Sequence, residues 1–381
     1  MQPSATRWTG CATWRRRPWA RGSASKPPLR RWTTTSSPTP SRPTRATRRS
    51  ASPCTSARPS RPNRRGKRQQ MKLNIGMHTG PQRCTFDELR RLWRIADSTG
   101  FYQVSVWDHF YDDPSPDGSG PNHEAVSTLA ALASETKNVR VGVYAFCVGY
   151  RHPAVLAKAA ATLDQMSNGR FELGLGAGWY EREYRTYGIP FPSVGVRMDM
   201  LEEAVQIIKS MLTKRTTTFK GKHYQLENAF CEPKPVQKKP KIWVCGAGEK
   251  RTLNIAAKYG DAWNIPYPSP EVFGQKCQVL DDWCAKLGRN PKDIYRTVNV
   301  GLFMGTSAAD AKKKRQVFEE MFGERAAVQG GGMLLGTPKE VVDRIGAYAD
   351  AGAEGLNIVL RAPFLWDSLQ TFIEEVKPAF K

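Results

Sequence analysis

The sequence predicts an α/β protein whose folded part is a (β/α)8, or TIM-type, barrel over residues 71–381. Short β-branched or aliphatic runs alternate in this region with helix-length amphipathic stretches, which is the pattern of βαβ units in a parallel sheet. Eight strands can be counted, and about 310 residues are long for one ordinary domain but suit an α/β barrel. Because helices cover such a sheet, we expect the strands to be buried.

The expected strands and helices alternate along the chain. The strands are expected at Leu73–Met77, Gln103–Trp107, Val139–Phe146, Arg170–Leu175, Lys241–Cys245, Ala262–Pro266, Tyr295–Met304 and Gly355–Leu360. The helices are expected at Asp87–Ser98, His123–Thr136, Pro153–Met166, Met198–Leu212, Lys250–Tyr259, Glu271–Leu287, Ala308–Phe322 and Pro338–Ala351.

Capping residues support several of these helix boundaries. Thr85 precedes a first turn that contains two acids, and Thr337 precedes a proline at the first helical position. Glycines follow three of the expected helix ends, at Gly100, Gly260 and Gly352.

Insertions are expected after the fourth strand and before the eighth. Residues 179–197 form a long connection rich in Tyr, Glu and Arg, and Thr216–Tyr224 predicts a small hairpin that turns at Lys220-Gly221. The second insertion, Phe322–Leu335, contains three consecutive glycines, which fit a mobile lid and a flexible connection equally well. We expect residues 179–197 and 322–335 to select the substrate.

Residues 1–70 differ in composition from the rest of the chain, and we expect them to be a disordered tail. They contain 16 Arg and 2 Lys with no Asp or Glu, and so carry +18 of the formal net charge of +23. This composition fits a transit peptide, a basic nucleic-acid-binding tail, or sequence translated upstream of the true start. We favour the third interpretation, because ten prolines oppose an amphipathic helix and Met71 opens a strand-like run.

The body of the chain has the composition expected of a cytoplasmic protein. Its net charge is only +5, so we expect neither nucleic acid nor a membrane as a partner. No apolar run approaches transmembrane length, and the six cysteines form no C-x-x-C pair, which is typical of reduced thiols. The five histidines show no metal-binding spacing and no G-x-S-x-G motif occurs, so we expect an organic cofactor and no metal.

The first candidates for chemistry follow the second strand, because βα loops build the active face of such barrels. Asp108 and His109 stand there between two aromatic residues. A strand-end Asp-His pair can transfer a proton or orient a substrate, but an Asp that caps the next turn and a His stacked on aromatics explain the motif equally well. His152, at the start of a later helix, is expected to be a capping or packing residue instead.

Two Gly-Ala-Gly loops follow the fourth and fifth strands. The first, Gly176-Ala177-Gly178 with Trp179 next to it, permits close backbone approach to a ligand. The second, Gly246-Ala247-Gly248, leads into helix periodicity that starts at Thr252, so free amides and the positive end of a helix dipole could meet a phosphate. The adjacent Lys250-Arg251 pair could neutralise that phosphate.

Taken together, these segments resemble the luciferase-like monooxygenase superfamily. The similarity lies in Tyr150–Trp179, which reads YRHPAVLAKAAATLDQMSNGRFELGLGAGW, and in Trp107–Phe110, Trp243–Leu253 and Gly336–Val342. It extends from about Met71 to the C-terminus. Gly178–Tyr184 and Phe191–Arg197 look most like the branch that uses the deazaflavin coenzyme F420, whose neighbours are FMN-dependent monooxygenases of the alkanesulfonate type.

The resemblance implies that a flavin or deazaflavin ring lies in the barrel mouth, with His109 beside it as the catalytic residue and Asp108 in contact with the cofactor. A non-prolyl cis peptide would back the ring at Val143–Tyr144 or one residue to either side. The remaining cofactor-binding residues would be Val143, Tyr144 and Ala145 at this bond, Gly176, Ala177, Gly178 and Trp179 beside the ring, and Gly246, Ala247, Gly248 and Arg251 at the phosphate.

One position departs from the sugar-phosphate dehydrogenases of this family, which carry a catalytic Glu directly after the glycines of the fourth strand. Trp179 stands there in this chain, which leaves Glu181 or Glu183 as weaker candidates for an acid.

Three functions remain open at this point. The first is hydride transfer between F420 and a small organic substrate. The second is a two-component monooxygenase that receives reduced FMN from a reductase, and the third is a barrel that binds flavin or F420 without turnover, as a carrier or sensor. The aliphatic positions of the outer helices leave room for a homodimer, which the resemblance also favours.

Overall fold

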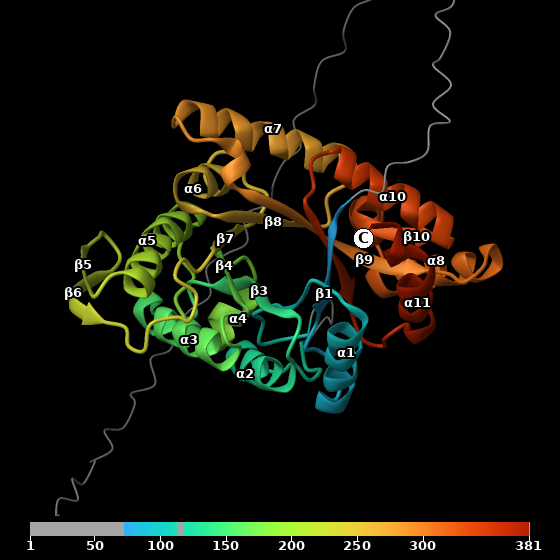
Figure 1. Ribbon diagram of the computed structural model, residues 1–381, viewed down its shortest axis with the longest axis horizontal. Coiled ribbons are helices and arrows are strands. Elements are labelled where there is room, and N and C mark those ends of the chain that lie inside the picture. Colours follow the sequence, from blue (N-terminus) through green and yellow to red (C-terminus); the bar gives the residue numbers. More distant parts are fainter. Residues whose placement is uncertain (1–71, 113–117, 381) are drawn as a thin grey trace, which may run out of the picture. The chain divides into compact units, whose positions relative to one another are not determined.

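The computed structural model describes residues 72–112 and 118–380, in which a closed ring of parallel strands is surrounded by helices (Figure 1). The predicted (β/α)8 barrel is therefore confirmed. The ring consists of β1 (Asn74–Thr79), β2 (Gln103–Val106), β3 (Arg140–Cys147), β4 (Phe171–Gly176), β7 (Ile242–Cys245), β8 (Ala262–Pro266), β9 (Tyr295–Met304) and β11 (Gly355–Leu360). The predicted tail and its boundary at residue 70 lie outside the described residues.

The ring closes because its last strand pairs with its first. The order is β9, β11, β1, β2, β3, β4, β7 and β8, and β8 pairs again with β9. Every pairing in the ring is parallel, from Asn74 beside Gly355 in β1 and β11 to Ala262 beside Tyr295 in β8 and β9. All strands therefore end at the same mouth, where side chains from distant parts of the sequence meet.

The helices lie outside the ring (Figure 1). Eight match the predicted ones within a few residues: α1 (Phe86–Thr99), α2 (Ala125–Glu135), α3 (Pro153–Met166), α5 (Val194–Thr213), α6 (Thr252–Tyr259), α7 (Pro270–Lys286), α8 (Ala308–Phe322) and α10 (Pro338–Asp350). Three short helices are additional: α4 (Glu181–Thr186), α9 (Arg325–Gln329) and α11 (Trp366–Thr371). None of the helices in the described part of the chain is long and apolar enough to span a membrane.

Helix α1 shows how the sequence pattern becomes packing. The Thr85 side chain accepts a hydrogen bond from the Glu88 amide at 3.2 Å, and the Glu88 carboxylate accepts one from the Thr85 amide at 2.8 Å. This reciprocal capping satisfies two backbone donors at the helix start. Leu89, Leu92 and Trp93 recur on one face and are at most 1% exposed, and burying each contributes about 1.5–3 kcal/mol.

The two insertions contain more regular structure than the sequence predicts. The hairpin is confirmed as β5 (Thr216–Lys220) and β6 (Gln225–Phe230), which pair antiparallel. The long connection after β4 includes α4, and the second insertion includes α9 and a ninth parallel strand, β10 (Met333–Gly336), which pairs with β9 outside the ring. A four-residue strand behind three glycines has no alternating pattern, so the sequence did not reveal it.

Candidate active site

A cavity of about 680 Å³ opens at the carboxyl ends of the barrel strands. Nine of the predicted site residues line it: Asp108, His109, Tyr144, Ala145, Gly176, Ala177, Gly178, Trp179 and Gly246. Val143 is fully buried in β3, and Ala247, Gly248 and Arg251 are not among the lining residues. The mouth thus brings together the loops after β2, β3, β4 and β7, as expected for this fold.

His109 is held by a buried carboxylate from α4. Its Nδ1 lies 2.8 Å from Oε2 of Glu183, whose side chain is completely buried. The same carboxylate accepts hydrogen bonds from the Tyr150 hydroxyl at 2.5 Å and from the amides of Phe110 and Tyr111 at 2.6 and 2.8 Å. Four donors on one buried acid fix the position of the imidazole.

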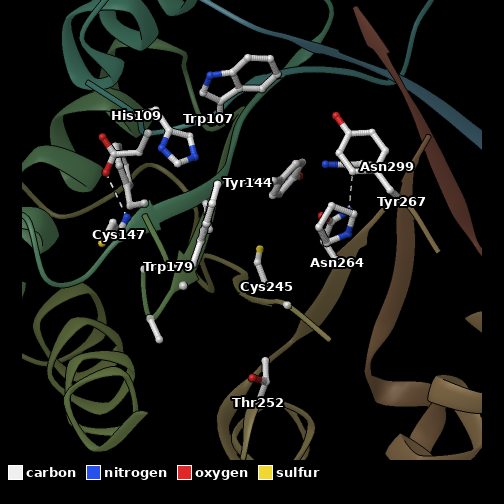
Figure 2. A pocket seen from close by; sticks show the side chains of 18 of the residues that line it. Trp107, His109, Tyr144, Cys147, Trp179, Cys245, Thr252, Asn264, Tyr267 and Asn299 are labelled. Carbon is white, nitrogen blue, oxygen red and sulfur yellow. Dashed lines mark hydrogen bonds between the residues drawn. The ribbon is translucent and has the colours of Figure 1, made fainter. Parts of the chain in front are cut away.

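The charge of Glu183 determines which nitrogen of His109 carries a proton. Burial by itself would raise the pKa of Glu183, but the hydrogen bonds from His109 and Tyr150 and the charge of His109 outweigh it, so this pKa is lowered. An ionised carboxylate can only accept, so Nδ1 of His109 must be the donor. Nε2 is left as the nitrogen that can exchange a proton with a ligand, and the ring lines the cavity (Figure 2).

Aromatic side chains surround this imidazole. The ring centroid of Trp179 lies 5.6 Å from that of His109 at an interplanar angle of 73°, and Tyr180 stacks on Trp179 at 5.1 Å. Trp179 lines the cavity and is 60% exposed, so part of its ring faces solvent.

Asp108 has a different environment from its neighbour. Its carboxylate is buried and accepts two hydrogen bonds from Arg151, at 2.7 and 3.0 Å, and one from the Cys147 amide at 3.0 Å. Burial raises the pKa of Asp108, and Arg151 opposes that shift. The acid therefore ties the end of β2 to the end of β3, and its contact with a cofactor stays a prediction.

The predicted cis peptide occurs at the end of β3. It joins Tyr144 and Ala145, one residue beyond the first expected position and inside the expected range. The pairing register between β3 and β4 shifts here, between Val143 and Phe146. Both residues of the bond line the cavity, so this backbone forms part of its wall.

The opposite wall is built from the β7–α6 loop. Gly246 has φ +130°, a conformation that side chains rarely adopt, and Thr252 at the start of α6 lines the cavity with it. A Cβ atom at Gly248 would stand 2.8 Å from the Thr252 hydroxyl, so glycine leaves this hydroxyl room. The Arg251 guanidinium lies 2.6 Å from Asp199, and its predicted contact with a phosphate is untested.

These two walls fit a phosphate-bearing aromatic cofactor. The flat surfaces of Trp107, Tyr144 and Trp179 could contact a ring, and the start of α6 with its glycine loop could contact a phosphate. The described residues contain no group of three His, Cys, Asp or Glu side chains that could hold a metal ion. His152 caps α3, accepting from the Ala154 amide at 3.2 Å, as predicted.

Several cavity residues were missed at the sequence level. His78 at the end of β1 is buried, its Nδ1 lies 2.8 Å from the Ser105 hydroxyl, and burial together with Arg361 lowers its pKa to about 3. It is therefore a neutral residue at neutral pH. Asn264 and Asn299, from β8 and β9, also line the cavity. His78 stands near the end of its strand and could have been found by that signal, whereas Asn264 and Asn299 lie within their strands and carried no such signal.

The fold and the cavity together define a TIM-barrel enzyme whose ligands bind at the carboxyl ends of its strands. The profile of the luciferase-like monooxygenases matches residues 71–332, and the chain belongs to this family of oxidoreductases.

Its curated relatives divide between two cofactors. The chain is 28% identical over 307 residues, 74% of this chain and 89% of the relative, to an F420-dependent glucose-6-phosphate dehydrogenase of Microbacterium testaceum. It is 27% identical over 327 residues, 77% of this chain and 86% of the relative, to an FMNH2-dependent dimethylsulfone monooxygenase of Pseudomonas fluorescens.

A solved structure shares the fold. It is an F420-dependent secondary alcohol dehydrogenase in complex with an F420–acetone adduct, which superposes with a TM-score of 0.71 at 22% identity, covering 82% of this chain and 100% of that chain.

Proposed function

We propose that the protein transfers a hydride between coenzyme F420 and a small organic substrate, with His109 as the proton carrier. The observation that carries this proposal is the 2.8 Å contact between His109 Nδ1 and the buried Glu183 carboxylate. It orients Nε2 as the exchangeable nitrogen in a cavity large enough for a ring and a substrate.

F420, when bound, would supply the chemistry of accepting or returning a hydride. For an alcohol substrate, His109 Nε2 would take the hydroxyl proton while the carbinol carbon gives up its hydride, which leaves a carbonyl product. The ionised Glu183 would stabilise the positive charge that this proton brings to the imidazole. In the reverse direction the same nitrogen would return the proton to the carbonyl oxygen.

The remaining walls support binding and orientation. Gly246 and Thr252 would hold the phosphate, and the Tyr144–Ala145 peptide would contact the ring. The partly exposed Trp179 would limit the access of water, which strengthens electrostatic interactions inside.

A second function is supported by the relatives. The chain matches an FMNH2-dependent monooxygenase over 77% of its length, about as well as the F420-dependent dehydrogenases. In that case a separate flavin reductase would be a partner, and His109 would take part in the reaction with oxygen.

Titration of the full-length protein with F420 and with FMN tests the choice. We expect F420 to bind at least tenfold more tightly, measured by cofactor fluorescence, and turnover with F420 to proceed without oxygen. Tighter FMN binding together with oxygen-dependent turnover would replace the first proposal by the second.

The location, oligomeric state and partners of the enzyme are also proposals. We infer a cytoplasmic homodimer that acts on small molecules, without nucleic acid or membrane as a partner. Light scattering on the purified full-length chain measures its mass directly and would expose a monomer.

A further inference from the structure

Two buried amides form part of the cavity wall away from His109. Asn264 on β8 and Asn299 on β9 are 1% and 2% exposed, and both line the cavity. The Asn264 amide nitrogen donates a hydrogen bond of 2.9 Å to Oδ1 of Asn299 (Figure 2). Neither residue belongs to the His109 or glycine-loop machinery described above.

One polar atom of each amide is already hydrogen-bonded to neighbouring groups. Nδ2 of Asn264 also donates to the Thr297 hydroxyl at 2.9 Å, and that hydroxyl donates to the Trp263 carbonyl at 3.4 Å. Oδ1 of Asn299 also accepts from Nδ2 of Asn357 at 2.8 Å. Within residues 72–112 and 118–380, the hydrogen bonds of the pair leave Oδ1 of Asn264 and Nδ2 of Asn299 without a partner.

The network continues through further side chains to Tyr144. Asn357 Oδ1 accepts from Gln103 at 2.7 Å, and Gln103 Oε1 accepts from the Tyr144 hydroxyl at 2.8 Å. Burial raises the pKa of Tyr144, so this hydroxyl keeps its proton and remains a donor. A Cβ atom at Gly76 would stand 2.0 Å from Asn357 Oδ1, so only glycine leaves room for the network. If the oxygen and nitrogen atoms of all these side-chain amides were exchanged, the Asn264–Asn299 pair would still present one donor and one acceptor to the cavity.

We propose that Asn264 and Asn299 recognise a cis-amide edge, in which a carbonyl oxygen adjoins an N–H group. Asn299 Nδ2 would donate to the carbonyl, and Asn264 Oδ1 would accept from the N–H. A carboxylate or a simple ketone would leave Asn264 Oδ1 unpaired or facing another acceptor, and unpaired buried groups disfavour such ligands strongly. The edge belongs either to a lactam- or imide-type substrate or to the pyrimidine-like edge of the cofactor ring.

This inference rests on the proposed function only in placing the ligand in the same cavity. It can therefore be tested on the full-length protein without any cofactor, using 2-piperidone and N-methyl-2-piperidone as probes in ligand-observed NMR titrations. Methylation removes the N–H donor and keeps the ring and the carbonyl. We expect about tenfold weaker binding of the methylated probe, the scale of a lost hydrogen bond to a buried group. Equal affinities would overturn the proposal without any mutation.

Variants then test whether Asn264 and Asn299 cause the preference for 2-piperidone over its methylated form. Asn264→Leu and Asn299→Leu should bind both probes equally, while Asn74→Leu, which removes a partly buried amide outside the cavity, should keep the preference. Thermal unfolding verifies that each variant is folded. A preference that persists in both folded cavity variants would refute the assignment.

Cofactor titrations of the same variants show whether the recognised edge belongs to the substrate or to the cofactor ring. If Asn264→Leu weakens F420 or FMN binding about tenfold and cofactor displaces 2-piperidone, the edge is that of the cofactor ring. If cofactor affinity is unchanged and 2-piperidone binds alongside the cofactor, the edge is that of the substrate. A wild-type protein that prefers 2-piperidone but binds neither cofactor would contradict the proposed function and leave this inference standing.

Discussion

The two walls of the cavity are built by different means. On the β2–β4 side, two buried carboxylates meet side chains far apart in sequence: Glu183 lies 2.8 Å from His109 Nδ1, and Asp108 pairs with Arg151. On the β7–α6 side, Gly246 and the helix start at Thr252 line the cavity, and Arg251 of the same loop pairs with Asp199. Buried charge is suited to orient a proton, while exposed backbone amides are suited to hold an anion. Mutations on the two walls should therefore affect different steps.

The largest effect is expected from His109→Ala. If His109 carries the proton, turnover should fall about a hundredfold or more, the scale of a general acid-base group, with little change in cofactor affinity. Steady-state kinetics and a fluorescence titration measure the two quantities. His152→Ala, which removes a capping histidine outside the cavity, is the control, and equal turnover in both variants would exclude His109.

Glu183→Gln should have the next largest effect. It removes the charge that stabilises a protonated His109 and replaces one of the two acceptor oxygens by an NH2 donor, so turnover should fall about tenfold or more while cofactor affinity holds. The pH dependence of kcat should also change, which loss of packing alone would not cause. Glu181→Gln is the matched control, because Glu181 is exposed and pairs with Arg185. Similar kinetics in the two variants would contradict the role of Glu183.

On the other wall, Thr252→Val should weaken cofactor binding about tenfold, the scale of a hydrogen bond to a charged group, and leave kcat within a few-fold. Arg251→Ala should have a smaller effect, because its guanidinium is already engaged by Asp199. Fluorescence titration of both variants checks the order. A larger effect of Arg251→Ala would restore this residue as the main phosphate ligand.

The smallest effect is expected on stability at acidic pH. The pKa of Glu183 lies below its ordinary value of 4.5 in the folded state, so the unfolded chain binds protons more readily. The stabilisation from Glu183 is therefore present above pH 4.5 and is lost as pH falls through the folded pKa.

Urea unfolding of wild type and Glu183→Gln at neutral and acidic pH measures this loss. The difference between the two proteins should shrink on acidification. His78, whose pKa is lowered to about 3, destabilises both proteins below its ordinary value of 6.5 and cancels in the comparison. A constant difference at all pH values would show that folding does not shift the pKa of Glu183.

The sequence predicted the barrel and most of its mouth because both depend on local pattern. Strand-end glycines, the Asp108-His109 pair and the cis peptide follow from short motifs or from the family resemblance. The partner of His109 is 74 residues away, on a helix that the sequence read as a connection, so only the folded chain brings Glu183 to it. The Asn264–Asn299 pair was not predicted for a similar reason, because the two residues lie in different strands and neither is part of a sequence motif.

Strand β10 has a consequence for how such an enzyme could be altered. It joins the sheet only through β9, so the eight strands of the ring keep all their mutual pairings without it. The segment from the end of β9 to β10 nevertheless contributes Arg325 and Gln329 to the cavity. An exchange of this segment would therefore change residues that line the cavity without changing the strand pairings of the eight-stranded ring.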